Sequence, residues 1–216
     1  MKKVLVTGFQ PFGGEQVNPS LEAVKLLNGQ TIAGYAIVAG EIPVVRFAAT
    51  EAIIKLIAEH QPEIVINVGQ AGGRTEMSVE RVGINVDDYR SPDNAGNAPI
   101  DEPIAVDGPA AYFATLPIKA MVKAMVEAGV PAHVSSTAGT YLCNHVCYAV
   151  PHYIAVHQLP IRSCFIHIPF LPEQAAGKPG RASMALETIV AGLRAGVEAA
   201  IRYQGSDVQE TGGTTH

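Results

Sequence analysis

Short apolar runs alternate with longer amphipathic segments along most of this chain, and that alternation constrains the fold more than any other feature. The runs 2–7, 63–68 and 163–168 are mostly apolar, and each is followed by Gly or Pro, as is typical of buried strands. Strand patterns that alternate with helix patterns indicate an α/β protein. We therefore expect a three-layer α/β/α sandwich around a twisted, mostly parallel but mixed central sheet.

The same patterns give approximate bounds for the other elements. Asn18 and Pro19 predict a helix start, because Asn is a favoured N-cap and Pro suits the first helical position. The further helices expected are 46–60, 118–128, 143–157 and 182–203. The other segments expected are strands over 35–43 and 132–136, extended structure over 77–86 and a long loop over 91–109.

Composition narrows the class of protein. The 216 residues suit one compact domain, and 48% hydrophobic with 16% charged residues exclude a mostly disordered chain. We expect one catalytic domain over 1–204 and a flexible tail over 205–216. A net charge of -5 without a Lys/Arg cluster gives no sign of a nucleic-acid or membrane partner. No apolar run is long enough for a signal peptide or a membrane span, so a cytoplasmic protein is expected.

The three cysteines differ in context. Cys143 follows a turn and opens a predicted helix, where free N–H groups and the helix dipole favour a thiolate and could hold an oxyanion. A buried core cysteine is the alternative, and position alone leaves both open. Cys164 lies within a core strand, which favours a structural role. Cys147 with His145 matches no common zinc spacing, so no metal is expected.

A cysteine nucleophile needs a base and an acceptor that orients it. His167 ends the strand that follows the Cys143 helix. In a parallel βαβ unit that strand end and the helix start lie at the same sheet edge, so the two should meet. Glu80, among apolar residues, or the pair 87–88 could orient the imidazole. A salt bridge with a neighbouring element is the structural alternative for Glu80.

The segment 8–14 is a glycine-rich loop at a strand end. It lacks the lysine of a phosphate-binding loop and the spacing of a dinucleotide-binding loop, so a nucleotide cofactor is not expected. Its two aromatic residues, Phe9 and Phe12, suit a flat, uncharged ligand. The alternative is that both rings only seal the end of the sheet.

Five segments together resemble the pyroglutamyl peptidase type I family, also called pyrrolidone carboxyl peptidases. They are 6–14 with Asn18-Pro19-Ser20, 80–85, 88–94, 136–145 and His167-Ile168-Pro169-Phe170, and the likeness extends from Val4 to about Tyr203. The segment around Cys143 is the most specific of them. Two positions depart from the family pattern: Gln10 replaces a common acidic residue, and Ser91 replaces an apolar pocket residue.

The resemblance implies a metal-free thiol protease that removes an N-terminal pyroglutamyl (5-oxoproline) residue from peptides through a thioester. It implies Cys143 as nucleophile, His167 as base, Glu80 as orienting carboxylate and Arg90 near the oxyanion. The implied pocket residues are Phe9, Phe12, Asn18, Gln70, Tyr141 and Leu142. A homotetramer is implied as well. The competing hypotheses are an amidase or N-acyl hydrolase with the same triad, and a non-catalytic binding module or nucleoside-handling protein of similar sheet topology.

Overall fold

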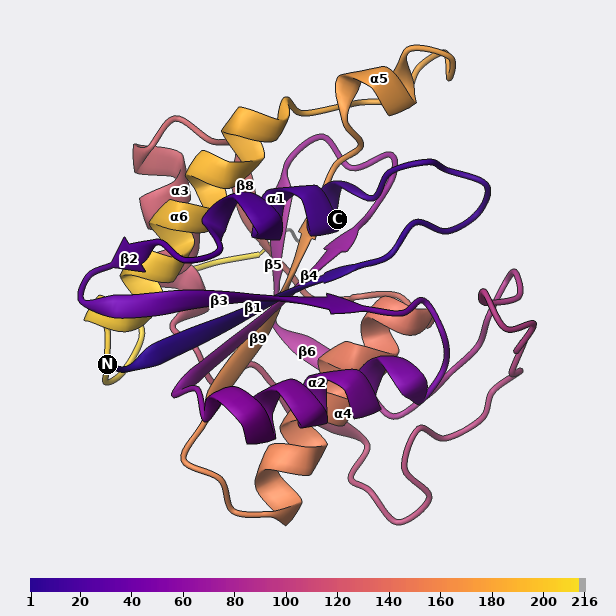
Figure 1. The fold of residues 1–216 in the computed structure, drawn as a ribbon, viewed down its shortest axis with the longest axis horizontal. Helices are drawn as coiled ribbons and strands as arrows, with labels where there is room; N and C mark the ends of the chain where they lie inside the picture. Colours follow the sequence, from indigo (N-terminus) through magenta and orange to yellow (C-terminus); the bar gives the residue numbers. More distant parts are fainter. Residues whose placement is uncertain (214–216) are drawn as a thin grey trace.

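The computed structural model describes residues 1–213 and shows a layered α/β fold (Figure 1). Seven strands form the main sheet in the order β2-β3-β1-β4-β9-β5-β8. Their bounds are β1 Lys3–Phe9, β2 Thr31–Ile32, β3 Tyr35–Ile42, β4 Ile64–Gln70, β5 Met77–Glu80, β8 Ala132–Ser135 and β9 Arg162–Ile168. The central strands β3, β1, β4 and β9 are parallel neighbours, whereas β2 and β5 join the sheet antiparallel. The predicted mixed, mostly parallel sheet is thus confirmed.

Helices cover both faces of this sheet. The helices are α1 Pro19–Leu27, α2 Ala48–His60, α3 Ile118–Glu127, α4 Leu142–Val156, α5 Pro172–Ala175 and α6 Leu186–Arg202. In Figure 1, α1, α3 and α6 lie on one face and α2 and α4 on the other. Each layer buries its own apolar cluster against the sheet, one built on α1, α3 and α6 and one on α2 and α4. The three-layer sandwich expected from the sequence is therefore observed.

The direction of β8 differs from the expectation. β8 pairs parallel with β5, and β5 pairs antiparallel with β9, so β8 and β9 run in opposite directions with β5 between them. The unit β8-α4-β9 is therefore not a parallel βαβ crossover, and that argument for bringing Cys143 to His167 was wrong. Both residues nevertheless lie at the sheet edge where β4 and β9 end, with Gly69 between them. Strand direction depends on pairing partners that are remote in sequence, which apolar patterns do not encode.

Short elements and one helix start also differ from the expectation. The sequence patterns missed β2, α5 and β7 Ala111–Phe113, all too short to show a period. β6 Val82–Ile84 lies within the predicted extended segment 77–86 and forms a small antiparallel sheet with β7. Helix α6 begins at Leu186 instead of 182, because the preceding residues stay extended. The backbone N–H of Met184 donates to the carbonyl of Phe170 at 2.8 Å, and Ser183 forms a β-bridge with Phe170.

The segment 205–213 contacts the start of α3. The Asp207 carboxylate accepts the backbone N–H groups of Lys119 and Ala120 at 2.8 and 2.9 Å, as an N-cap side chain would. Glu210 forms an ion pair with Lys123 at 3.0 Å. The flexibility of 205–216 stays a prediction, and its last three residues lie outside the described part.

None of the helices in residues 1–213 combines the length and the apolar character that crossing a bilayer requires.

Candidate active site

Cys143 is the second residue of α4, at the edge of the sheet where β4 and β9 end. The first N–H groups of a helix have no partner within it, so the backbone around the sulfur offers free donors. The Sγ atom lies 2.9 Å from where a Cβ on Gly69 would stand. Gly69 in turn pairs with His167 across β4 and β9. The missing side chain of Gly69 therefore leaves room for the sulfur next to the β4 residue that pairs with His167.

Gly69→Ala tests this arrangement. The added methyl group would stand 2.7 Å from Phe165 Cζ and 2.9 Å from Cys143 Sγ, so one of them must move. We expect a loss of about 1–3 kcal/mol in unfolding free energy and a fall in kcat of up to about 100-fold, because the nucleophile is displaced. Urea unfolding and steady-state kinetics measure both. Gly177→Ala is the matched control, because a methyl group there has no neighbouring atom within 4 Å. Equal effects in the two variants would contradict the close packing of Cys143 Sγ against Gly69.

Glu80 and His167 lie diagonally across the antiparallel pair β5 and β9. Ser78 is opposite His167 and Glu80 is opposite Phe165, so Glu80 and His167 are two residues apart on the same face. The His167 ring places Nδ1 2.7 Å from Glu80 Oε1, and both residues are buried. A carboxylate only accepts, so Nδ1 carries the hydrogen and Nε2 is left to take a proton. Glu80 is thus the acceptor, while the alternative Asp87 bonds His145 instead.

Burial sets the protonation states of this group. It raises the pKa of the Cys143 thiol to about 12, the Glu80 carboxylate adds to the rise, and Arg74 opposes it. Burial likewise lowers the pKa of His167, although Glu80 pulls it upward. Burial therefore favours the uncharged forms, a thiol at Cys143 and a neutral imidazole at His167, although the helix start favours a thiolate. A thiol in this state attacks a carbonyl only once a base takes its proton, and His167 is the base that the sequence predicts.

Arg74 belongs to this cluster, and the sequence analysis missed it. Its Nη1 donates to Glu80 Oε1 at 2.7 Å, and its Nη2 donates to the Thr137 carbonyl at 3.0 Å. The salt bridge expected as the structural alternative for Glu80 is therefore observed, and its catalytic role stays a prediction. A signal was present, because a lone carboxylate among apolar residues requires a cation and the loop after β4 supplies one.

A small pocket opens beside Cys143. It has a volume of about 40 Å³ and contains every pocket residue expected from the resemblance, together with Val44, which was not expected. The lining residues are Phe9, Phe12, Asn18, Val44, Gln70, Tyr141, Leu142 and Cys143. None of these side chains is acidic or basic. Val44 follows β3, and no motif marked it, because its place depends on how β3 pairs with β1.

The polar pocket side chains are already bonded within the protein. Asn18 caps α1 through Ser20 N at 3.1 Å and donates to the Gln10 carbonyl at 3.0 Å. The Gln70 carbonyl oxygen accepts from Gln174 Nε2 at 3.0 Å. These bonds hold the side-chain amides of Asn18 and Gln70 in place as part of the pocket wall.

Arg90 lies apart from the cluster of Glu80 and His167. It is exposed, and it takes part in no hydrogen bond or ion pair within residues 1–213. Its neighbours border the pocket: Tyr89 packs on Tyr141 with ring centroids 4.6 Å apart, and Thr140 bonds Asp88. Its role near the oxyanion stays a prediction.

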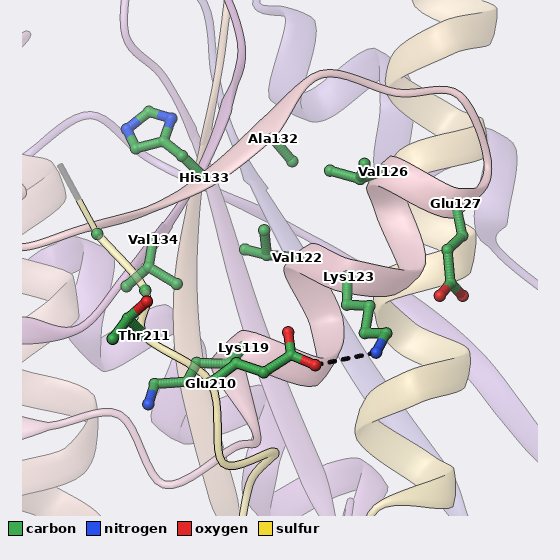
Figure 2. A pocket seen from close by; sticks show the side chains of 12 residues that line it. Lys119, Val122, Lys123, Val126, Glu127, Ala132, His133, Val134, Glu210 and Thr211 are labelled. Atoms are coloured by element: carbon green, nitrogen blue, oxygen red, sulfur yellow. Dashed lines mark hydrogen bonds and ion pairs between the residues drawn. The ribbon is translucent and has the colours of Figure 1, made fainter.

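A larger cavity lies elsewhere on the protein. It has a volume of about 480 Å³ and lies between α3, β8 and residues 210–213 (Figure 2). The figure shows the Lys123–Glu210 pair at its edge, and none of Cys143, His167 and Glu80 lines it. In the described part of the chain, no cluster of three or more His, Cys, Asp or Glu side chains could hold a metal ion.

Comparison with known proteins agrees with this geometry. The family model for pyroglutamyl peptidase matches residues 2–203. A pyrrolidone-carboxylate peptidase of Cupriavidus taiwanensis is 58% identical, and pyrrolidone-carboxylate peptidase 1 of Ralstonia nicotianae is 56% identical, each over 100% of both chains. The crystal structure of pyroglutamyl peptidase I from Bacillus amyloliquefaciens superposes with a TM-score of 0.93 and 46% identity, covering 96% of this chain and 100% of the other. The chain belongs to the pyroglutamyl peptidase family.

Proposed function

We propose that this chain, a cysteine peptidase for N-terminal pyroglutamyl residues, uses Cys143 as nucleophile, His167 as general base and Glu80 as the carboxylate that orients it. The observation that carries the proposal is the buried His167–Glu80 bond of 2.7 Å at the sheet edge where Cys143 Sγ lies against Gly69. This arrangement supports the combination of nucleophile, base and orienting group that covalent catalysis requires.

The reaction follows from these positions. His167 Nε2 takes the thiol proton while Cys143 Sγ attacks the pyroglutamyl carbonyl carbon, and the carbonyl oxygen becomes an oxyanion. Free backbone N–H groups at the start of α4 stabilise this charge, with Arg90 as a further proposed donor. When the C–N bond breaks, His167 returns the proton to the leaving amine and a thioester remains. Water, deprotonated by His167, then hydrolyses the thioester and releases pyroglutamate.

The pocket supports a substrate with a blocked N-terminus. A pyroglutamyl residue has no free α-amine, so it presents a small, flat and uncharged ring. The lining of the pocket beside Cys143 is mostly apolar and aromatic, its amide side chains Asn18 and Gln70 are uncharged, and it has no carboxylate to bind an ammonium group. Phe9, Phe12 and Tyr141 provide contact area for the ring, and backbone groups meet its lactam N–H and C=O.

Hydrolysis of coumarin amides tests this selectivity. We expect kcat/KM for the pyroglutamyl amide to exceed that for the prolyl and alanyl amides by at least about 100-fold, since those substrates bring a charged amine into an uncharged pocket. Prolyl amide is the closest control, because it keeps the ring but lacks the lactam carbonyl. Equal rates for the three substrates, or equal hydrolysis of simple N-acyl amides, would contradict the proposed specificity.

We also propose a homotetramer and a cytoplasmic location. The tetramer rests on the family resemblance, and light scattering of the purified protein would contradict it by giving the mass of a monomer. The location is supported by three cysteines that are all free in the structure, as is typical of a reducing compartment.

A further inference from the structure

Arg74 is held in a fixed position next to the proposed catalytic residues. The turn 71–74 closes through a bond from Arg74 N to the Ala71 carbonyl at 3.2 Å. Ala71 N in turn donates to the Ile168 carbonyl, one residue after His167, at 2.9 Å. The guanidinium is therefore anchored to the end of β9, the strand that carries the base.

Two bonds of this guanidinium connect separate parts of the site. Nη1 meets the same Glu80 oxygen that His167 uses, and Nη2 meets the Thr137 carbonyl in the turn that leads to Cys143. The Arg74 side chain is 27% exposed, whereas that of Glu80 is fully buried. Two charge-assisted bonds to one oxygen, Oε1, limit the freedom of this buried carboxylate to rotate away from the imidazole.

We propose that Arg74 is a positioning residue, which holds the Glu80 carboxylate against His167 and ties it to the turn before Cys143. The inference rests on the proposed function, because it assigns the support of the same catalytic residues. Arg74 acts through Glu80 and the turn, so a change at Arg74 should affect kcat far more than KM.

Arg74 also balances charge. With Glu80 ionised and Arg74 positive, the buried group is neutral when His167 is neutral. The groups facing His167 and Glu80 are Arg74 from the β4–β5 turn and the thiols Cys143 and Cys147 from α4. Without the guanidinium, the carboxylate would hold a proton on His167 more strongly, and less of the enzyme would carry a free base.

The test is the pH profile of kcat/KM for Arg74→Gln. Its acid limb reports the pKa of the base in the free enzyme. Burial lowers the pKa of His167 and Arg74 adds to that lowering, so removing the guanidinium moves the limb to higher pH. We expect this shift together with a fall in kcat of about 10- to 100-fold at neutral pH, part of what a positioned base contributes, and a KM within about twofold of the parent.

Two further variants complete the test. Arg74→Lys keeps the charge but not both bonds, so its acid limb should stay in place while kcat falls. Arg181→Gln, at an exposed arginine whose Nη1 lies near Gly73, should change neither. If Arg74→Gln does not fold, Arg74→Lys decides, and a kcat equal to the parent's would overturn the positioning role.

The variant Glu80→Gln distinguishes a failure of the role proposed for Arg74 from a failure of the proposed catalytic mechanism. One outcome would overturn the role of Arg74 alone. In it, Glu80→Gln lowers kcat, whereas Arg74→Gln keeps the parent's kcat and the parent's acid limb. Unchanged kinetics in Glu80→Gln would instead remove Glu80 from the catalytic group and overturn the proposed mechanism.

Discussion

Cys143→Ala is expected to lower kcat for a pyroglutamyl amide by about 10⁴-fold or more, to the level of background hydrolysis. Without the sulfur no thioester forms, and the neighbouring His167 has no proton to take. The substitution removes one atom from a half-buried position at the start of α4. We therefore expect the circular dichroism spectrum and the unfolding midpoint to remain close to the parent's, so that the loss is one of chemistry.

The other two cysteines provide matched controls for this change. Cys147 lies one turn further along α4 and Cys164 lies within β9, and both are buried free thiols. Cys147→Ala and Cys164→Ala should keep kcat within a few-fold of the parent and affect mainly stability. A Cys143→Ala variant that keeps its activity, or a loss of equal size in Cys147→Ala, would contradict Cys143 as the nucleophile.

The sequence alone was sufficient to single out the three proposed catalytic residues, because each has an unusual local context. These contexts are a thiol at a helix start, a histidine at a strand end and a carboxylate among apolar residues. The structure brings Cys143, His167 and Glu80 to one edge of the sheet. The start of α1 could also be predicted from neighbouring residues alone, and the structure shows Asn18 as its N-cap.

The features that the sequence did not indicate depend on long-range pairing. The antiparallel insertion of β5 between β9 and β8 places Glu80 on the face of His167, and no periodicity shows strand direction. Arg74 is one arginine among many until Glu80 is placed beside it. Val44 joins the pocket only because β3 lies next to β1, which carries Phe9.

Asp87 is the centre of a second buried network, which joins the segment between β6 and β7 to α4 and to the residues just before α2. Its Oδ2 accepts from Arg46 Nε and from His145 Nδ1, both at 2.8 Å, and the Asp87 and His145 side chains are fully buried. Asp87 also exchanges two backbone bonds with Glu102, at 2.7 and 3.0 Å. The adjacent Asp88 bonds both the backbone and the hydroxyl of Thr140, three residues before Cys143.

Asp87→Ala is expected to destabilise the protein by about 3–5 kcal/mol, because it leaves the Arg46 charge and a buried histidine without their common acceptor. The change in the midpoint of urea unfolding at constant m measures this loss. Activity should fall with stability, since the loop that Asp87 anchors carries Tyr89, which packs against the pocket residue Tyr141.

Glu102→Gln is the matched control, because Arg46 bonds this second carboxylate as well. Its side chain is 53% exposed and the pair is at 2.6 Å, so water screens the interaction and replaces much of it. We expect a loss below about 1 kcal/mol. The difference between the two variants comes from burial and not from the number of ion pairs on Arg46. A cost in Glu102→Gln as large as that in Asp87→Ala would mean that the guanidinium depends on both carboxylates alike, and the buried histidine would then contribute little to the network.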